Sequence, residues 1–315
     1  MKNERVRLGL TDLKVRAMGV GAWAWGDRFV WGFGQGYGKE DVAEAFHASR
    51  EANLDFFDTA EIYGLGTSER LLGEFIRSDG PAPMVATKFM PYPWRLRRKS
   101  LVKALRDSLD RLGLSRVDLY QIHQPMPPVS IETWMDGLAE AVELGLTRAV
   151  GVSNYSPKQM ERAHKALARH GIPLASNQVE YSLLTRNPEA SGLLQLCRDL
   201  NVTLIAYSPI GMGLLTGKYG PWNPPPAARR RRVRLSLTWL TSLLDTLAEI
   251  GRAHGGKTPA QVAINWTIAK GTLPIPGAKN RRQAAENFGA LGWALTDAEV
   301  ARLDELSDPD GRIGR

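Results

Sequence analysis

Four polar residues of the sequence have side chains suited to one kind of chemistry: Asp58, Tyr63, Lys88 and His123. A phenol has a pKa of about 10, so at neutral pH it is a weak proton donor. An ammonium group beside it lowers that pKa, and a carboxylate holds the ammonium in place. An imidazole can hydrogen-bond a substrate oxygen and orient it. Such a set could protonate a carbonyl oxygen while a cofactor delivers hydride to the carbonyl carbon, since none of these side chains supplies hydride.

Each of these residues also has a structural explanation. An aspartate after a strand often caps the next turn, and a buried lysine–aspartate pair can serve the fold alone. Tyr63 could be a packed loop aromatic, and His123 a hydrogen-bonded core histidine. For any one residue taken singly the structural explanation is favoured, because perturbed groups are often structural. Their joint placement at the ends of successive predicted strands favours the chemical explanation.

Alternating apolar runs and amphipathic segments must position these residues. The apolar runs predict eight strands, at 18–21, 54–58, 84–88, 117–123, 148–153, 175–180, 203–208 and 273–276. Eight strands alternating with helices indicate the α/β class and a parallel sheet closed into a (β/α)8 TIM barrel, whose reactive groups gather at the carboxyl ends of the strands. Asp58, Lys88 and His123 end the second, third and fourth strands, and neighbouring strands lie about 4.8 Å apart. We therefore expect these side chains to converge.

The segments around the strands complete the predicted barrel. Amphipathic spacing predicts helices at 39–52, 100–112, 131–144 and 157–169, an extra helix at 240–250 before the eighth strand, and C-terminal helices at 281–291 and 297–306. Segments 5–8 and 13–16 flank a turn and predict a hairpin that closes the barrel bottom. Since no boundary divides the chain, we expect one barrel domain over residues 1–315.

Composition excludes several classes of protein. The 315 residues are 43% hydrophobic and 23% charged, and the net charge of +8 favours an anionic ligand without naming it. The single cysteine, Cys197, excludes an intramolecular disulfide and any multi-cysteine metal site, so no metal is expected. No apolar run approaches the roughly 20 residues of a membrane span, and the N-terminus lacks the apolar region of a signal peptide. A cytoplasmic protein that does not bind membranes is the expectation.

One motif is misleading. Residues 251–258 match the phosphate-loop pattern G-x-x-x-x-G-K-S/T, which needs a buried strand before the loop. Here the segment before the loop carries leucines at helical spacing, so a helix rather than a strand is expected there. Pro259 after Thr258 indicates an ordinary helix start. The dinucleotide fingerprint G-x-G-x-x-G is absent. A phosphate-loop nucleotidase is therefore disfavoured.

Over nearly its whole length, the chain resembles the aldo-keto reductases, in particular their bacterial and plastid general reductases, to which the potassium-channel β subunits are related. The resemblance rests on Asp58-Thr59-Ala60-Glu61-Ile62-Tyr63-Gly64, Ala86-Thr87-Lys88, Leu119-Tyr120-Gln121-Ile122-His123, Gly151-Val152-Ser153-Asn154-Tyr155, Asn177-Gln178-Val179-Glu180-Tyr181, Ala206-Tyr207-Ser208-Pro209 and Ile275-Pro276-Gly277-Ala278-Lys279. It implies a barrel that binds NADP(H) without a Rossmann fold and reduces aldehydes or ketones to alcohols. It also implies Tyr63 as proton donor, Lys88 and Asp58 as its tuners and His123 as the orienting residue.

The same resemblance implies a cofactor site. Ser153, Asn154 and Gln178 correspond to the residues that hold the nicotinamide carboxamide, and Tyr207 to the aromatic that stacks on the nicotinamide ring. Ser208, Ile210, Gly211, Met212 and Lys218 correspond to residues around the pyrophosphate, and Gly277, Lys279, Gln283, Glu286 and Asn287 to those at the adenosine end. Trp23 and Pro209 are further implied cofactor contacts. Lys279 favours NADPH because a 2′-phosphate binds a cation, and Arg281 and Arg282 could assist.

Aromatic residues in two loops suggest the substrate side. Trp25, Trp31, Tyr92 and Trp94 would line a pocket suited to an apolar or aromatic aldehyde or ketone. The alternative is that several of these rings pack the barrel top. Gln124 stands where members of this branch often carry tryptophan, so the pocket wall is expected to differ from theirs.

Two other functions compete with the reductase. A cofactor-sensing partner protein like the potassium-channel β subunits is one, but those proteins depart from the tetrad at the histidine position, and His123 is present. A nucleic-acid-binding barrel would use the basic run at 229–232. That run lacks interleaved aromatics and fits a solvated loop at 219–238 better. The oligomeric state is left open.

Overall fold

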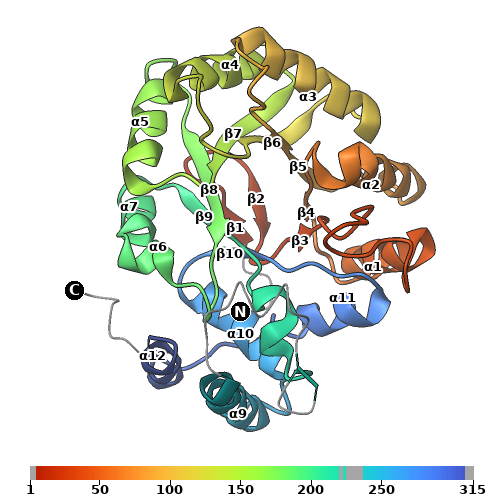
Figure 1. Ribbon diagram of the computed structural model, residues 1–315, viewed down its shortest axis with the longest axis vertical. Coiled ribbons are helices and arrows are strands. Elements are labelled where there is room, and N and C mark those ends of the chain that lie inside the picture. The colour runs from red at the N-terminus through yellow and green to blue at the C-terminus, as the bar shows by residue number, and fades with distance from the viewer. Residues whose placement is uncertain (1–4, 220–222, 225–236, 309–315) are drawn as a thin grey trace.

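The computed structural model describes residues 5–219, 223–224 and 237–308, and it contains the predicted barrel of parallel strands (Figure 1). The eight strands are β3 (Val20–Gly21), β4 (Phe56–Asp58), β5 (Met84–Phe89), β6 (Val117–Ile122), β7 (Thr147–Ser153), β8 (Leu174–Glu180), β9 (Thr203–Tyr207) and β10 (Leu273–Ile275). They pair in chain order from β3 to β10, each parallel to the next. All eight predicted strands are present, with ends that differ from the prediction by up to two residues.

The two outer strands of the sheet meet and close the barrel. The backbone amide of Gly19 donates to the carbonyl of Pro274 at 2.9 Å, and Gly21 donates to Pro276 at 3.2 Å. Gly21 and Gly277 also form a parallel bridge. A side chain at Gly21 would collide with the carbonyl oxygen of Ile275, 2.9 Å from where its Cβ would lie. The absence of a side chain at this position therefore lets the first and last strands approach.

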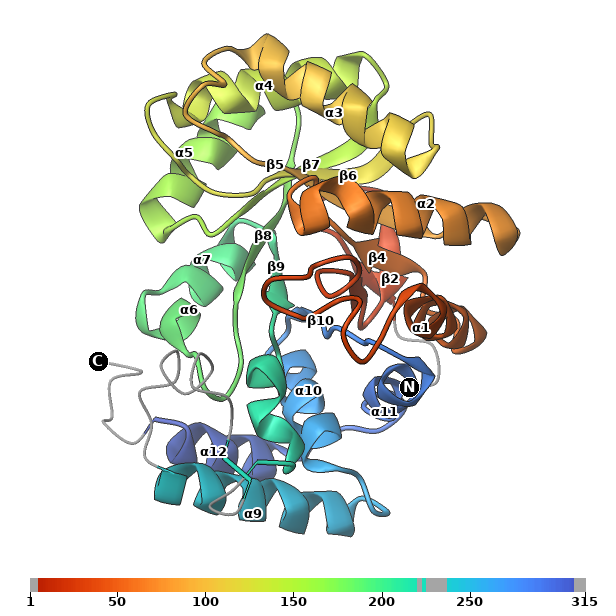
Figure 2. The same ribbon diagram turned by 45° about the vertical axis from the view of Figure 1, so that its right-hand side comes forward.

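Helices surround the strands on the outside of the barrel (Figure 1). The helices are α1 (Lys39–Glu51), α2 (Thr67–Ser78), α3 (Arg98–Leu112), α4 (Ile131–Glu143), α5 (Pro157–Ala168), α6 (Asn187–Ala190), α7 (Leu193–Asp199), α9 (Leu237–Ala253), α10 (Pro259–Ala269), α11 (Arg281–Phe288) and α12 (Asp297–Leu306), with 3-10 turns η1 (Tyr63–Gly66) and η2 (Gly211–Thr216). The extra helices α9 and α12 pack side by side outside the ring, as Figure 2 shows. The sequence prediction did not include α2 as a defined segment.

Local sequence signals explain several helix starts. Ser156 caps α5 and Thr258 caps α10, and each side chain accepts a hydrogen bond from the backbone two residues beyond the following proline. The segment 251–258 is therefore the end of α9, a turn and the cap of α10. This arrangement agrees with the rejection of the phosphate-loop motif, because a helix rather than a strand precedes it.

The hairpin predicted at the N-terminus closes the bottom of the barrel. Strands β1 (Arg5–Arg7) and β2 (Lys14–Arg16) pair antiparallel. Leu8, Leu13 and Val15 are buried in one cluster with the inward residues of the barrel strands, among them Phe56 and Leu119. Because this apolar cluster fills the amino ends of the strands, polar side chains can gather at the carboxyl ends instead.

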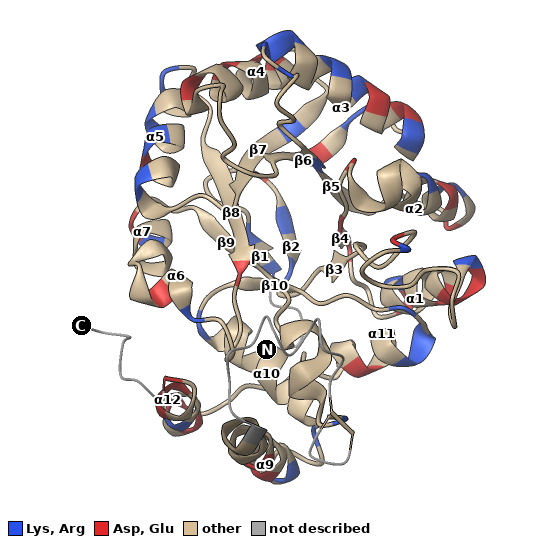
Figure 3. Cartoon of the chain, viewed as in Figure 1, with Lys and Arg blue, Asp and Glu red and all other residues tan. Residues whose placement is uncertain are grey.

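Charged residues lie mainly on the outer helices, with both signs interspersed (Figure 3). The basic run predicted to be a solvated loop, at 229–232, lies outside the described residues, as does most of the segment 219–238. In the part of the chain that is described, no helix combines the length and apolar character that crossing a membrane requires.

Candidate active site

Three neighbouring strands bring the predicted catalytic side chains together. Asp58 is the last residue of β4, Lys88 lies near the end of β5, and His123 directly follows β6. The ammonium of Lys88 donates to the carboxylate of Asp58, to the carbonyl of Thr59 at 2.9 Å and to the hydroxyl of Tyr63 at 3.4 Å. Asp58 and Lys88 are both buried. The convergence expected from the strand-end positions is therefore present in the structure.

Two amide side chains complete the hydrogen bonds of Asp58. Its second carboxylate oxygen accepts from Gln178 at 2.8 Å and from Gln121 at 3.2 Å. A buried carboxylate needs such donors, because burial without them would be costly. Gln121 belongs to this site although the sequence analysis gave it no role. Its position two residues before His123, on the same strand, was the available signal.

The electrostatic environment of Tyr63 differs from the expectation. Burial raises the pKa of Tyr63 well above its usual value, and the carboxylates of Asp58 and Asp27 raise it further. The prediction that Lys88 lowers this pKa is therefore wrong, because Asp58 compensates the ammonium charge and desolvation of the phenolate dominates. Burial also lowers the pKa of Lys88, although Asp58 opposes that shift. Tyr63 consequently keeps its proton throughout the neutral range.

The imidazole of His123 faces Tyr63. The two rings meet edge to face with centroids 5.6 Å apart. Burial and the ammonium of Lys88 lower the pKa of His123 to about 3, so the ring is neutral at physiological pH. Its Nδ1 atom is buried and has no hydrogen-bond partner among the described residues. A neutral imidazole retains one N–H donor, which suits it to orient a carbonyl oxygen.

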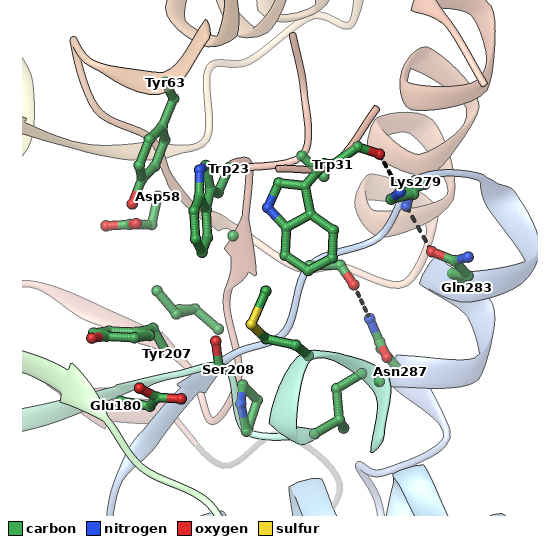
Figure 4. A pocket seen from close by; sticks show the side chains of 18 of the residues that line it. Trp23, Trp31, Asp58, Tyr63, Glu180, Tyr207, Ser208, Lys279, Gln283 and Asn287 are labelled. Atoms are coloured by element: carbon green, nitrogen blue, oxygen red, sulfur yellow. Dashed lines mark hydrogen bonds between the residues drawn. The ribbon is translucent and has the colours of Figure 1, made fainter. Parts of the chain in front are cut away.

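A cavity of about 580 Å³ opens above these residues at the carboxyl ends of the strands (Figure 4). This size is typical of small-molecule sites. Its lining includes most residues predicted for the site: Trp23, Trp31, Asp58, Tyr63, His123, Ser153, Asn154, Gln178, Tyr207, Ser208, Pro209, Ile210, Met212, Lys218, Gly277, Lys279, Gln283, Glu286 and Asn287. Lys88 lies behind this lining and reaches the cavity through Tyr63.

One end of the cavity carries interlocked amide and hydroxyl groups. Asn154 donates to Ser153 Oγ at 3.0 Å and accepts from the hydroxyl of Tyr207 at 3.0 Å. Ser153 donates to the carbonyl of Gln178 at 2.8 Å. Asn154, Ser208 and Met212 line the cavity with φ values of 62°, 52° and 54°. Residues held in this sparsely populated region cluster at functional sites.

The other end of the cavity carries a cation. The ammonium of Lys279 donates to the carbonyl of Trp31 at 2.7 Å, and the Lys279 amide donates to Gln283 at 2.9 Å (Figure 4). Asn287 donates to the carbonyl of Gly277 at 3.2 Å. The cavity therefore combines amide and hydroxyl groups, a stacking ring in Tyr207 and a cation at its far end. This donor set fits a nicotinamide cofactor.

Some predicted site residues lie outside the cavity lining. The Trp25 side chain is buried in the core against Phe57 and Phe75, and its indole N–H donates to the carbonyl of Ala278 at 2.8 Å. Its assignment to the substrate pocket is wrong, since packing holds the ring between the barrel and α2. Gly211 is buried beneath the lining.

The predicted aromatics after β5 also lie outside the lining. The rings of Tyr92 and Trp94 stack with centroids 4.7 Å apart, and Trp94 is 73% exposed. Neither residue is among those that line the cavity. Of the four predicted substrate-pocket residues, Trp31 alone is among the lining residues.

Glu180, which had no predicted site role, also lines the cavity, together with Gln124, expected in the pocket wall, and Arg282, expected to assist at the cofactor phosphate. Glu180 ends β8 as Asp58 ends β4, so the strand-end rule could have identified it. Asp27 lies behind Trp23 and was not singled out, because nothing in its local sequence distinguishes it from a surface residue.

Comparison with known proteins gives consistent matches. The model of the Aldo/keto reductase family matches residues 17–308. The chain is 43% identical over 315 residues to the chloroplastic pyridoxal reductase of Arabidopsis thaliana, covering 96% of this chain and 85% of that one. It is 33% identical over 287 residues to an aldo-keto reductase of Schizosaccharomyces pombe whose name specifies NADP(+), covering 85% and 82%. The solved glycerol dehydrogenase of Gluconobacter oxydans superposes with a TM-score of 0.85 at 25% identity, covering 100% of this chain and 98% of that one.

Proposed function

Because the chain belongs to the aldo/keto reductase family of oxidoreductases, we propose that it reduces aldehydes or ketones to alcohols with NADPH, using Tyr63 as the proton donor. We further propose that residues 1–315 act as one barrel domain. The observation that supports the reaction best is the contact of the Tyr63 hydroxyl with the Lys88 ammonium, 3.4 Å away, at the floor of the cavity.

In this proposal, NADPH supplies the hydride that the protein side chains lack. Tyr63 holds a proton at its hydroxyl and donates it to the carbonyl oxygen of the substrate. An alkoxide oxygen is more basic than a phenolate, so a phenol with a raised pKa can still protonate it. The phenolate left behind faces the Lys88 ammonium, whose positive charge stabilises it. Asp58 keeps that ammonium in place.

His123 orients the substrate in this proposal. Its neutral ring faces Tyr63 and lines the cavity, so an N–H of the imidazole can donate to the same carbonyl oxygen. Its pKa of about 3 supports this role, because the ring carries no charge that would compete with Lys88 at neutral pH. The retained histidine also favours the reductase over a purely cofactor-sensing partner protein.

The cofactor assignment rests on the two ends of the cavity. Ser153, Asn154 and Gln178 offer the paired donors and acceptors that a carboxamide needs, and Tyr207 offers a ring for stacking. Lys279 offers the cation for a 2′-phosphate. The name of the Schizosaccharomyces pombe relative supports NADP(+) over NAD(+).

The cavity wall and one relative favour a class of substrate. Trp23 and Trp31 present indole rings beside Tyr63. The name of the Arabidopsis relative identifies pyridoxal, a planar aromatic aldehyde, as its substrate. We therefore propose planar aromatic aldehydes as the preferred class, because flat rings gain most from stacking on aromatic walls.

A substrate panel tests this function. The purified protein is mixed with NADPH or NADH and a set of aldehydes and ketones that includes pyridoxal, and loss of reduced-nicotinamide absorbance is followed. We expect turnover with NADPH, fastest for aromatic aldehydes, and weaker turnover with NADH. Absence of NADPH oxidation across the panel, in protein shown to bind NADPH, would contradict the proposal.

A further inference from the structure

A buried carboxylate outside the proposed catalytic set organises the aromatic wall of the cavity. Asp27 lies in the loop between β3 and α1 and is 9% exposed. One of its oxygens accepts from the backbone amides of Val30 at 2.7 Å and Trp31 at 3.3 Å, and the other accepts from the indole N–H of Trp23 at 3.1 Å. Within the described residues, no salt bridge joins Asp27 to a cation. These N–H groups therefore compensate the buried charge.

The hydrogen bonds of Asp27 hold the Trp23 indole directly and the backbone of Trp31. The Trp23 ring stacks on Tyr63 with centroids 5.9 Å apart and an interplanar angle of 25°. The Trp31 ring meets Trp23 edge to face at 5.5 Å. Figure 4 shows Trp23 standing between Tyr63 and Trp31, with all three facing the cavity. A carboxylate that does not itself line the cavity thus holds one side chain that does, the Trp23 indole, and the backbone of a second lining residue, Trp31.

The loop that carries Asp27 is also pressed against the turn that carries Tyr63. A Cβ atom at Gly64 would lie 2.4 Å from the carbonyl oxygen of Gly26. At Gly26, a Cβ atom would lie 2.6 Å from the side chain of Thr67. Because both residues lack a side chain, the backbone segments before Asp27 and after Tyr63 touch directly. The loop of Asp27 is therefore packed directly beside the turn of Tyr63.

We propose that Asp27 is a positioning residue that determines the preference of the active site for flat aromatic substrates, by holding the Trp23 indole against Tyr63. This inference rests on the proposed reductase function. A small aliphatic aldehyde needs only the oxygen-binding groups at the cavity floor. An aromatic aldehyde also packs on the indole wall, so it loses binding when that wall is free to rotate.

The test compares two substrates in the wild-type protein and three variants. Asp27→Asn has nearly the same shape but loses the charge, and its single carbonyl oxygen cannot replace both carboxylate oxygens, which accept from the backbone amides and from the indole N–H. Trp23→Phe removes the indole N–H, and the double variant completes a cycle. For Asp27→Asn we expect kcat/KM for an aromatic aldehyde such as pyridine-4-carbaldehyde to fall by about tenfold, the loss expected for one hydrogen bond to a charged group. For propionaldehyde we expect a change of less than about twofold, since it does not reach the wall.

Two controls separate positioning from general damage. Arg28→Gln changes the charge of the same loop at an exposed residue and should leave both substrates unaffected. If Asp27 acts through Trp23, Asp27→Asn should add little to the loss already caused by Trp23→Phe. Equal losses for both substrates, or additive losses in the double variant, would overturn the proposal.

A spectroscopic readout keeps the test independent of turnover. The indole N–H resonance of Trp23, assigned as the peak missing in Trp23→Phe, should shift in Asp27→Asn and stay in place in Arg28→Gln. If this resonance does not move in Asp27→Asn, the proposed contact is wrong even when activity changes. If the wild-type protein reduces no aldehyde, the reductase function fails, while the resonance still tests the contact between Asp27 and Trp23.

Discussion

The ammonium of Lys279 donates to the backbone carbonyl of Trp31 across 2.7 Å, joining two residues that are 248 positions apart in the chain. It also lies 5.2 Å from the Trp31 ring centroid and 4.2 Å from that of Tyr37. The cation proposed to bind the cofactor phosphate is thus in contact with the loop that forms the aromatic wall. In the proposed function, cofactor recognition and substrate recognition therefore meet at one side chain.

Replacing Lys279 by methionine should separate the two cofactors. We expect the Kd of NADPH to rise by about tenfold or more, because a charge-assisted hydrogen bond to phosphate is lost. NADH lacks that phosphate, so its Kd should change little. Isothermal titration with both nucleotides makes the measurement. Arg281→Ala is the matched control. Arg281 on α11 forms an exposed ion pair with Glu51 on α1, and it does not line the cavity. Equal weakening of both nucleotides would count against the assignment.

Gly64 offers a test of the close approach beside Tyr63. Its φ of 56° disfavours a side chain, and an added Cβ would lie 2.4 Å from the carbonyl oxygen of Gly26. Gly80→Ala is the control for backbone strain alone, since Gly80 has a φ of 92° and open space around it. We expect Gly64→Ala to lower the free energy of unfolding by about 2 kcal/mol more than Gly80→Ala does, because only Gly64 adds overpacking to strain. Urea denaturation measures both, and equal losses would show that the contact is unimportant.

The buried pair of Asp58 and Lys88 should be more costly to break than to remove. Asp58→Asn leaves the Lys88 ammonium buried without its counter-charge, which is expected to cost about 3–5 kcal/mol of unfolding free energy. Replacing both residues, as Asp58→Asn with Lys88→Met, should recover part of that loss. Denaturant titration at pH 7 compares the three proteins. A double variant less stable than Asp58→Asn would contradict this explanation of the pair.

The lowered pKa of His123 predicts an acid-dependent loss of stability. The pKa of the ring is about 3 in the folded protein and about 6.5 in an unfolded chain. Between these values the unfolded chain binds the extra proton, so the free energy of unfolding falls as pH falls. His123→Gln should reduce that slope by up to about 1.4 kcal/mol per pH unit. Urea titrations from pH 7 to pH 4 test this, with His164→Gln on α5 as the control histidine replacement. An unchanged slope in His123→Gln would be the contrary result.

The sequence predicted the barrel and the placement of Asp58 and Lys88 because both depend on local patterns. Apolar runs mark buried strands, and the carboxyl end of a parallel strand is a fixed position in this architecture. The N-terminal hairpin followed from its turn. Glu180 also lies at the carboxyl end of a strand, as Asp58 does, so its place at the cavity could have been predicted in the same way.

Other features depend on long-range packing. Trp23, Trp25 and Trp31 share one loop, yet Trp23 and Trp31 face the cavity while Trp25 packs in the core. A loop has no periodicity that would distinguish inward from outward positions. Here the Trp23 indole donates to Asp27, whereas the Trp25 indole donates to the carbonyl of Ala278. The pKa of Tyr63 was predicted in the wrong direction for a similar reason. Burial raises this pKa, Asp58 and then Asp27 raise it further, and the extent of burial is not visible from residue spacing.

The role of Tyr63 is tested most directly by single-turnover reduction of an aldehyde by Tyr63→Phe loaded with NADPH. Phenylalanine keeps the ring that stacks on Trp23 but removes the hydroxyl that donates the proton. We expect the rate of NADPH oxidation to fall by at least about a hundredfold, the usual contribution of a general acid. The Kd of NADPH, measured on the same preparation, should stay within about twofold of wild type, since the hydroxyl is assigned no cofactor contact. A variant that binds NADPH normally and reduces the aldehyde at the wild-type rate would contradict the proposed mechanism.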